Sequence, residues 1–297
     1  MTTLNQTSFA SQTAIPLKFF EHQQDAHVIR SDAEAIAIAR ELAQEFAKEA
    51  SLRDQERRLP LQEIQKYSQS GLWAINIPKA FGGAQVKYRT LAEVVKIISS
   101  VDSSLGQIAQ NHWAFVEHLR LDATPEQQKF FFELILKGIR LGNAFSEKGS
   151  KTVADLTTKI HKTAQGYEIN GEKFFATGAL LAHWIPIVAV DEQGRSYAAI
   201  VPRDTTGVEI INDWSGFGQR TTASGTVRLN HVFAREEYVI PVHQAFERPT
   251  PAGAISQFIQ AAVDAGIARG AIEETIQYVR QYSRPWIDSG LEKATDD

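Results

Sequence analysis

Residues 167–178, Tyr-Glu-Ile-Asn-Gly-Glu-Lys-Phe-Phe-Ala-Thr-Gly, are the clearest β signal in the chain. Asn170-Gly171 is the pair most favoured in a two-residue type I′ turn, because both positions of that turn need a positive φ. Short runs with β-forming residues flank the pair, at 167–169 and 173–175. We therefore predict a β-hairpin whose turn is Asn170-Gly171.

Further extended runs follow this stretch and are separated by glycine-containing turns. We predict strands at residues 184–190, 197–201, 208–211 and 226–229. Short strands at such spacing are typical of an antiparallel sheet. We assign residues 141–247 to a middle β-barrel-like domain.

Before this domain the pattern is helical, with apolar residues recurring every three or four positions from Ser31 to about Gly138. Ser31 and Glu34 have the spacing of a capping box, as do Thr124 and Gln127. We assign residues 31–140 to an N-terminal helical domain and expect residues 1–30 to be a flexible segment.

Helical periodicity returns after the β domain, from about Ile255 to Arg280. Gly266 and Gly270 are placed where another helix can approach closely. Residues 248–297 are interpreted as the start of a C-terminal helical domain. The expected class is therefore α+β, with an N-terminal helical bundle, a middle antiparallel β domain and an incomplete C-terminal bundle.

The composition excludes several classes of function. The chain of 297 residues has no cysteine and a net charge of −4, which argues against disulfide scaffolds, iron–sulfur clusters and nucleic-acid binding. Because no apolar run reaches 18 residues, we expect no membrane span and a cytoplasmic protein. Phosphate-loop, paired-histidine and serine-elbow motifs are missing from the sequence, which argues against nucleotide hydrolases, zincins and serine hydrolases. We expect no metal site.

His112 stands out among the histidines because it lies on the apolar stripe of its own predicted helix, with Leu105, Ile108, Phe115 and Leu119. A buried histidine is either hydrogen-bonded as part of the core or functional. Its position alone leaves both readings open.

Five landmarks resemble the acyl-CoA dehydrogenase superfamily, and they occur in that family's order. They are Ser146-Glu147, the segments 167–173 and 174–178, Ala199-Ile200-Val201-Pro202 before Gly207-Val208, and Ala261-Ala262 with Gly266-Ile267-Ala268. The resemblance implies the family's order of helical, β and helical domains along essentially the whole chain, and a flavin cofactor.

A flavin ring needs a flat apolar or aromatic neighbour and hydrogen-bonding groups at the edge where charge accumulates on reduction. By match to the family's motifs, Phe175 would cover the ring and Thr177 would bind its reactive nitrogen. The alternative is that Phe174 and Phe175 are ordinary strand residues. The cofactor-binding residues that the resemblance implies are Phe145, Ser146, Ser150, Thr152, Phe175, Ala176 and Thr177.

Several residues differ from the dehydrogenase pattern and resemble one branch of the superfamily instead. Lys148 replaces the family's proline, the loop at 149–152 is remodelled, and Asn111-His112 looks like the flavin monooxygenase branch, which includes dibenzothiophene monooxygenase and sulfur-acquisition oxidoreductases. That branch implies reduced FMN from a partner flavin reductase, although FAD stays open. It also implies O₂ and a small organosulfur substrate, His112 as a catalytic residue, and a homotetramer.

Relatives in the family have three more C-terminal helices, so we expect a truncated bundle without the general base of dehydrogenation. Two alternatives to the monooxygenase stay open. One is an FAD-dependent acyl-CoA dehydrogenase, which an acyl-CoA would identify by bleaching the bound flavin. The other is an inactive fragment or a non-catalytic partner subunit, which would bind no flavin.

Overall fold

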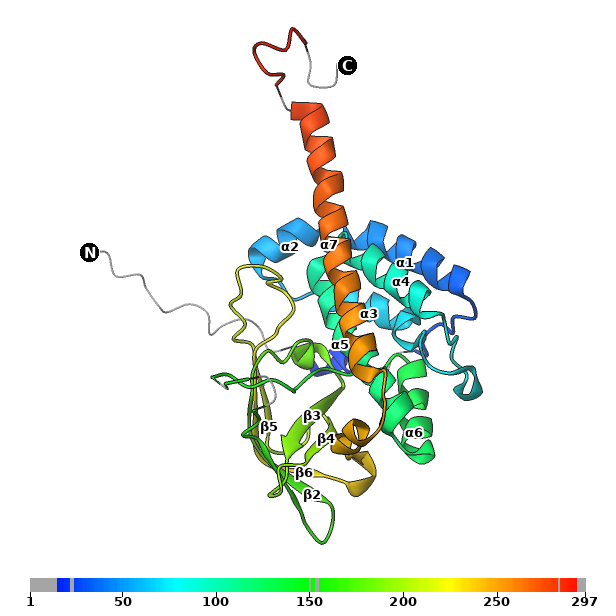
Figure 1. Ribbon diagram of the computed structural model, residues 1–297, viewed down its shortest axis with the longest axis vertical. Helices are drawn as coiled ribbons and strands as arrows, with labels where there is room; N and C mark the ends of the chain where they lie inside the picture. The colour runs from blue at the N-terminus through cyan, green and yellow to red at the C-terminus, as the bar shows by residue number, and fades with distance from the viewer. Residues whose placement is uncertain (1–14, 22–23, 150, 153–154, 283, 293–297) are drawn as a thin grey trace, which may run out of the picture.

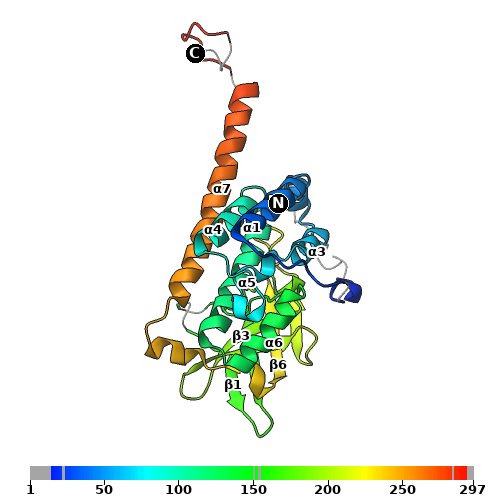
Figure 2. The same cartoon turned by 90° about the vertical axis from the view of Figure 1, so that its right-hand side faces the viewer.

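The computed structural model describes residues 15–21, 24–149, 151–152, 155–282 and 284–292. A helical body packs on a curled sheet, and one long helix runs across the body and projects beyond it (Figures 1 and 2). This confirms the predicted α+β architecture. The α-helices are α1 Asp32–Phe46, α2 Ala50–Glu56, α3 Leu61–Gln69, α4 Tyr88–Ser99, α5 Ser103–Asp122, α6 Pro125–Leu136 and α7 Ala252–Tyr282.

Two helices begin at the predicted caps. Thr124 and Gln127 form a full capping box, in which each side chain accepts from the other residue's backbone N–H, at 3.3 and 2.9 Å. Ser31 accepts from the Glu34 N–H at 3.1 Å, but the Glu34 carboxylate binds the backbone N–H of Arg30 instead of that of Ser31. The first helix therefore has half of the predicted box.

The sheet has seven strands in the order β5-β6-β2-β1-β3-β4-β7. All neighbouring pairs are antiparallel except β1 and β3, which run parallel at Lys159 and Val190, so the predicted antiparallel sheet is mixed. The strands are β1 Lys159–Lys162, β2 Tyr167–Lys173, β3 Trp184–Val190, β4 Ser196–Pro202, β5 Val208–Ile211, β6 Thr226–Ala234 and β7 Val239–Ile240.

The predicted hairpin turn at Asn170-Gly171 is wrong. These residues lie inside the single strand β2, and the chain turns instead between β1 and β2, where the Thr163 N–H donates to the Gly166 carbonyl. The pairing of β2 with β6 shifts register between Ile169 and Gly171, which is a bulge. A Cβ at Gly171 would lie 2.8 Å from the Cα of Thr158, so glycine serves close approach here.

Helix α6 joins the helical body to the sheet. Its Phe131 packs edge-on against Trp184 of β3, which in turn contacts Tyr238 next to β7. The same buried cluster includes Leu141, which forms an isolated parallel β-bridge with Trp184 of β3. The two domains therefore share a dry apolar contact.

Helix α7 packs on α4 through its glycines, as predicted. A Cβ at Gly266 would lie 2.6 Å from the Lys96 carbonyl oxygen, and one at Gly270 would lie 2.1 Å from that of Ser100. The helix is exposed beyond Gly270, where it leaves the body (Figure 1). Its exposed apolar side chains there are Ile272, Ile276, Tyr278, Val279 and Tyr282.

Three residues in the described part of the expected N-terminal segment 1–30 pack against the helical body, although most of its residues are exposed. Phe19, Ala26 and Ile29 are buried, and the His27 N–H donates to the Gln69 carbonyl at 2.8 Å. The remaining residues of that segment lie outside the described ranges.

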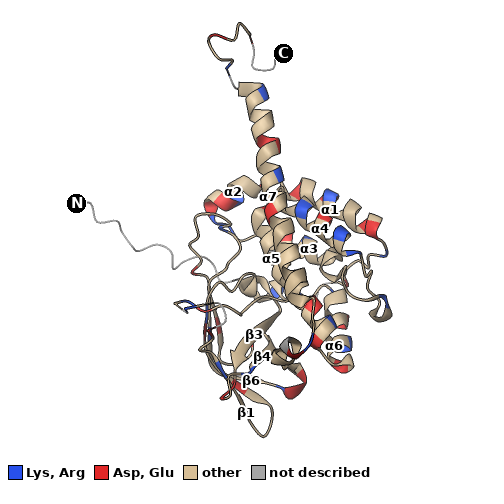
Figure 3. Ribbon diagram, viewed as in Figure 1, with Lys and Arg blue, Asp and Glu red and all other residues tan. Residues whose placement is uncertain are grey.

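Both α1 and α7 carry charges of both signs (Figure 3). No helix among the described residues combines the length and the apolar character needed to cross a bilayer. Within the same ranges, no three His, Asp or Glu side chains gather in a way that could hold a metal ion.

Candidate functional site

Phe175 lies just after β2 in a strained, exposed position. Its φ of 55° is in the left-handed region, which is uncommon for a residue with a side chain. Half of its surface is exposed, and its carbonyl accepts from the Thr177 N–H at 2.8 Å and the Asn143 side-chain amide at 3.3 Å. Strain that the surroundings maintain is a pointer to function.

Thr177 begins a chain of buried hydroxyl groups. Its Oγ1 lies 2.7 Å from the Ser224 Oγ, which lies 2.7 Å from the Thr222 Oγ1. The Thr222 hydroxyl also donates to the Gln219 carbonyl at 3.0 Å. Thr222 and Ser224, some 45 positions further along the chain, therefore hold the Thr177 hydroxyl near Phe175.

That segment, residues 212–225, brings a second aromatic ring to the site. Trp214 lies edge-on to Phe175 with the ring centroids 6.0 Å apart, and its indole N–H donates to the Gln219 carbonyl. The helical body anchors the segment, because Arg57 donates to the Gly216 carbonyl and Gln219 donates to that of Ser103. The site thus depends on contacts between the two domains.

A buried ion pair supports the other side of the site. The Lys173 ammonium donates to Glu147 at 2.7 Å and to the Phe145 carbonyl at 3.0 Å. Burial alone would raise the pKa of the Glu147 carboxyl, but hydrogen bonds from Lys173, Thr157 and Thr158 lower it to about 2. Burial lowers the pKa of Lys173, and Glu147 opposes that shift. The pair fixes the backbone that leads into Phe145 and Ser146.

The residues expected to bind flavin have different environments. Phe145 is partly exposed, and the Ser146 carbonyl accepts from the Phe174 N–H at 2.9 Å, so these two lie beside the Phe175 segment. Ala176 is buried in the sheet core, and its N–H donates to the Gly225 carbonyl. Its side chain is therefore committed to the core.

Two of the residues expected to bind flavin, Ser150 and Thr152, belong to a loop. Thr152 is exposed and forms a local turn in which its N–H donates to Asp155 at 2.8 Å. Ser150 lies outside the described residues. Nothing in the described contacts joins Thr152 to Phe175 or Thr177.

The side chains present fit an isoalloxazine ring. Phe175 offers an exposed aromatic face, Trp214 a second ring, and Thr177 a positioned hydroxyl, which are the two kinds of group that such a ring needs. Sequence reasoning missed Trp214 and Ser224. Their only local signal is a segment rich in Gly, Ser and Thr, which we interpreted as a connecting loop.

His112, which the resemblance implies to be catalytic, lies in the core of the helical body. The ring is fully buried, its Nε2 lies 2.9 Å from the Trp73 carbonyl, and its Nδ1 accepts from the Leu141 N–H at 3.1 Å. Burial lowers the pKa of His112 to about 3, so the ring is neutral. Nε2 is bonded within the helical body, and Nδ1 joins that body to Leu141, the first residue of the β domain. These contacts support a structural role, and the catalytic role stays a prediction.

Comparison with known proteins agrees with this arrangement. Residues 32–138 match the N-terminal domain of acyl-CoA dehydrogenase, and residues 144–232 match its middle domain. The chain is 34% identical to a probable FMNH2-dependent monooxygenase, SfnC, of Pseudomonas putida, over 89% of this chain and 66% of the relative. It is 31% identical to a dibenzothiophene monooxygenase of Rhodococcus erythropolis, over 90% and 67% respectively. The chain thus spans about two thirds of the length of these relatives.

Among solved structures, FMN-bound TdsC from Paenibacillus sp. A11-2 is similar to the chain. The TM-score is 0.83 and the identity 33%, over 89% of this chain and 69% of TdsC. The predicted resemblance is confirmed: the chain belongs to the acyl-CoA dehydrogenase family, with relatives named as flavin-dependent monooxygenases.

Proposed function

We propose that this protein is a flavin-dependent monooxygenase that uses reduced FMN and O₂ to oxidise a small organosulfur compound. The observation that carries the proposal is the strained, half-exposed Phe175 followed by the Thr177 hydroxyl, in a chain 33% identical to FMN-bound TdsC. The names of the relatives, an FMNH2-dependent monooxygenase and a dibenzothiophene monooxygenase, support the oxygen chemistry and the sulfur substrate. Use of the reduced cofactor implies a separate flavin reductase as partner.

The flavin, when bound, would supply the electrons that activate O₂. Phe175 would cover the ring, with Trp214 limiting the movement of the Phe175 side chain. Phe145 and Ser146 would border the ring on the other side, supported by the Glu147–Lys173 pair. These residues orient the cofactor and exclude water.

The Thr177 hydroxyl would be the hydrogen-bonding group at the ring edge. Each hydroxyl has one proton, and that of Thr222 goes to the Gln219 carbonyl. The Thr177 hydroxyl lies within hydrogen-bond distance of both the Ser224 oxygen and the Phe175 carbonyl, at 2.7 and 3.4 Å, so it can donate to the ring or accept from it.

The test combines the protein with FMN, NADH, an independent flavin reductase and either dibenzothiophene or a small alkyl sulfone under ¹⁸O₂. We expect product that carries ¹⁸O and depends on both the protein and the reductase. An oxidised product without label would contradict the proposal. Anaerobic bleaching of bound FAD by an acyl-CoA would instead identify the dehydrogenase alternative, and failure to bind any flavin would identify a non-catalytic subunit.

We also predict a cytoplasmic location, a homotetramer, and domain limits at residues 31–140 and 141–247. Cell fractionation, analytical ultracentrifugation and limited proteolysis test them in turn. A preference for FAD over FMN by about tenfold, which is about 1.4 kcal/mol, would count against the monooxygenase.

A further inference from the structure

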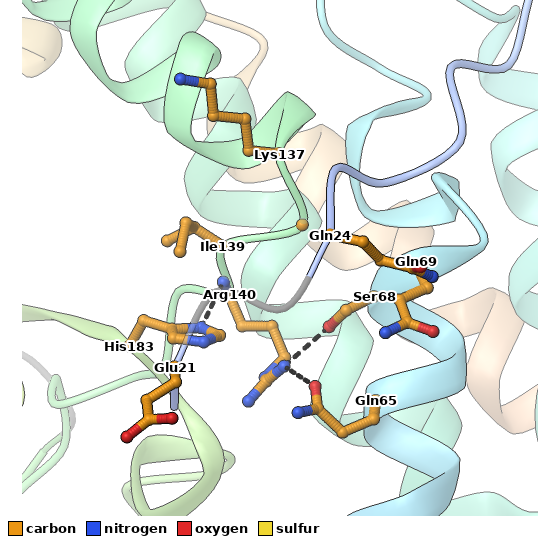
Figure 4. A pocket seen from close by; sticks show the side chains of 10 residues that line it. Glu21, Gln24, Gln65, Ser68, Gln69, Lys137, Ile139, Arg140 and His183 are labelled. Carbon is orange, nitrogen blue, oxygen red and sulfur yellow. Dashed lines mark hydrogen bonds between the residues drawn. The ribbon is translucent and has the colours of Figure 1, made fainter. Parts of the chain in front are cut away.

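Two separate sets of side chains join the helical body to the β domain. One set surrounds Arg140 at a small pocket, where the Arg140 Nη1 donates to Gln65 and Ser68 of α3 at 3.1 and 2.8 Å (Figure 4). The other set joins α2 to residues 212–225, which we call the Trp214 loop. The second set bears on the candidate flavin site, because this loop supplies the second ring and the buried hydroxyls described above.

Hydrogen bonds and close packing hold the Trp214 loop together internally. At its base, the Asp213 carboxylate accepts from the N–H and the hydroxyl of Thr226 at 2.8 and 2.7 Å. Inside the loop, the indole N–H donates to the Gln219 carbonyl at 3.0 Å. Gly216 lies close to the indole, since a Cβ there would be 2.4 Å from the nearest ring atom of Trp214. The loop is thus held as a unit, and its position depends on contacts from outside.

Helix α2 supplies two of these outside contacts. Asp54 lies in the last turn of α2, and Arg57 is the residue that follows the helix. The Asp54 carboxylate accepts from the Arg220 N–H at 3.0 Å, and the Arg57 Nη2 donates to the Gly216 carbonyl at 3.0 Å. Both contacts reach the loop between its indole ring and its buried hydroxyls.

Helix α2 is itself fixed to the helical body. Arg53, in the middle of α2, is only 1% exposed and forms ion pairs with Asp102 and Glu63 at 2.6 and 2.7 Å. Removing one partner of such a buried pair leaves an uncompensated charge, so the pair resists disruption. Ser103, next to Asp102, adds a third outside contact, because its carbonyl accepts from Gln219 of the loop at 3.3 Å. The loop is therefore held by a firm support.

Backbone strain is concentrated at the same place. Six residues other than glycine have a positive φ in the described ranges, and four of them belong to this contact or to the site: Arg57, Phe175, Gln219 and Ala223. Such conformations cost energy and persist only where the surrounding structure maintains them. The strain therefore indicates that the fold maintains one particular geometry between α2, the loop and the site.

We propose that Arg57 and Asp54 are positioning residues for the flavin site. They hold the Trp214 loop in the place from which its ring and the Ser224 hydroxyl support the two residues expected to contact the flavin. The inference rests on the proposed function, because it needs a flavin at that site. Neither Arg57 nor Asp54 has to touch the cofactor.

A single spin label reports the mobility of the loop without any cofactor. Because the chain has no cysteine, Phe217→Cys, at a loop residue that is 96% exposed, takes the label at one position. We expect Arg57→Gln to narrow the electron paramagnetic resonance lines of this label, because the loop loses a contact with α2 and becomes more mobile. Arg58→Gln changes the next arginine, which pairs with Glu49 and Glu56, and should leave the lines unchanged.

FMN titration of the unlabelled variants tests whether the position of the loop matters to the site. We expect Arg57→Gln to weaken FMN binding by about two- to thirtyfold, and Arg58→Gln to leave it unchanged. Asp54→Ala should weaken binding as well, whereas Asp54→Asn keeps a side-chain oxygen for the Arg220 N–H and should retain the wild-type affinity. If Arg57→Gln does not fold, this Asp54 pair decides the question with the same two measurements.

Gln65→Ala separates positioning from general stability, because it removes a contact with Arg140 at the other junction. It should lower the Tm and leave both the label and the FMN affinity unchanged. An equal loss of FMN affinity in Gln65→Ala and Arg57→Gln would overturn the proposal.

Two further results would overturn the proposal. One is an unchanged label in Arg57→Gln, and the other is a more mobile loop with the FMN affinity of the Arg58→Gln control. A wild-type protein that binds no flavin would contradict the proposed function instead, and the label would still show whether Arg57 holds the loop.

Discussion

Two aromatic rings have opposite environments in this chain. His112 is buried with both nitrogens bonded to backbone groups, whereas Phe175 is half exposed in a strained conformation. The first arrangement stabilises the fold, because it satisfies a carbonyl and an N–H in a dry contact between domains. The second costs conformational energy that the surrounding contacts offset, and together with the exposure of the ring this supports a functional role.

We expect His112→Phe to lower the free energy of unfolding, because it keeps a ring but leaves the Trp73 carbonyl and the Leu141 N–H unpaired. Each buried unpaired group costs about 1–3 kcal/mol. Urea unfolding measures this, with His161→Phe on the surface as control. An equally stable His112→Phe protein that releases hydrogen peroxide in place of product would support the catalytic role instead.

The Phe175→Gly variant distinguishes the cost of the positive φ at this position from the contribution of the aromatic ring to FMN binding. Glycine adopts positive φ without steric cost, so we expect stability to stay equal or rise. Loss of the ring should weaken FMN binding by about two- to tenfold, since an aromatic contact contributes about 0.5–1.5 kcal/mol. Calorimetric titration with FMN and a thermal melt give both readouts. Phe233→Ala, at another exposed phenylalanine, is the control, and equal FMN affinity in both variants would contradict the assignment.

At the scale of elements, α7 packs against α4 through close contact between the two helix backbones. We expect Gly270→Ala to destabilise the protein by about 1–3 kcal/mol, because a methyl group would lie 2.1 Å from the Ser100 carbonyl oxygen. Gly253→Ala on the same helix meets open space and should be neutral or stabilising by up to about 1 kcal/mol. Chemical denaturation of both variants checks this pair, and equal effects would show that α7 does not depend on close contact.

The whole molecule should lose stability in acid. The folded pKa values of His112 and Glu147, about 3 and 2, lie below the ordinary values of 6.5 and 4.5. Their contribution is fully present above the unfolded pKa values and is lost as the pH falls from about 6.5 towards 2. Each group adds a slope of about 1.4 kcal/mol per pH unit within its own window.

Unfolding measured from pH 7 to pH 3 tests this dependence. His112→Phe should flatten the part between pH 6.5 and 4.5, where Glu147 does not yet titrate. A wild-type curve that is flat over that interval, or a variant with the same slope, would show that His112 is charged or exposed in the folded protein.

Interactions between residues close in the sequence were sufficient to predict much of the architecture. Helix caps such as Thr124 and apolar periodicity depend on neighbours in the chain, so they predicted the order of helices, strands and helices. Strands 184–190 and 208–211 were predicted at their observed limits for the same reason. The family's motif around Phe175 and Thr177 located the candidate flavin site, although its individual roles await the variants above.

The tertiary structure decided what depends on distant neighbours. Asn170-Gly171 has the composition of a turn, but pairing of β2 with both β1 and β6 extends the strand through it and leaves a bulge. His112 turns to the core because Trp73 and Leu141 offer it backbone partners. Trp214 and Ser224 reach Phe175 and Thr177 only through the anchored loop. Such contacts join segments tens of residues apart, and packing selects among conformations that local propensity leaves nearly equal in energy.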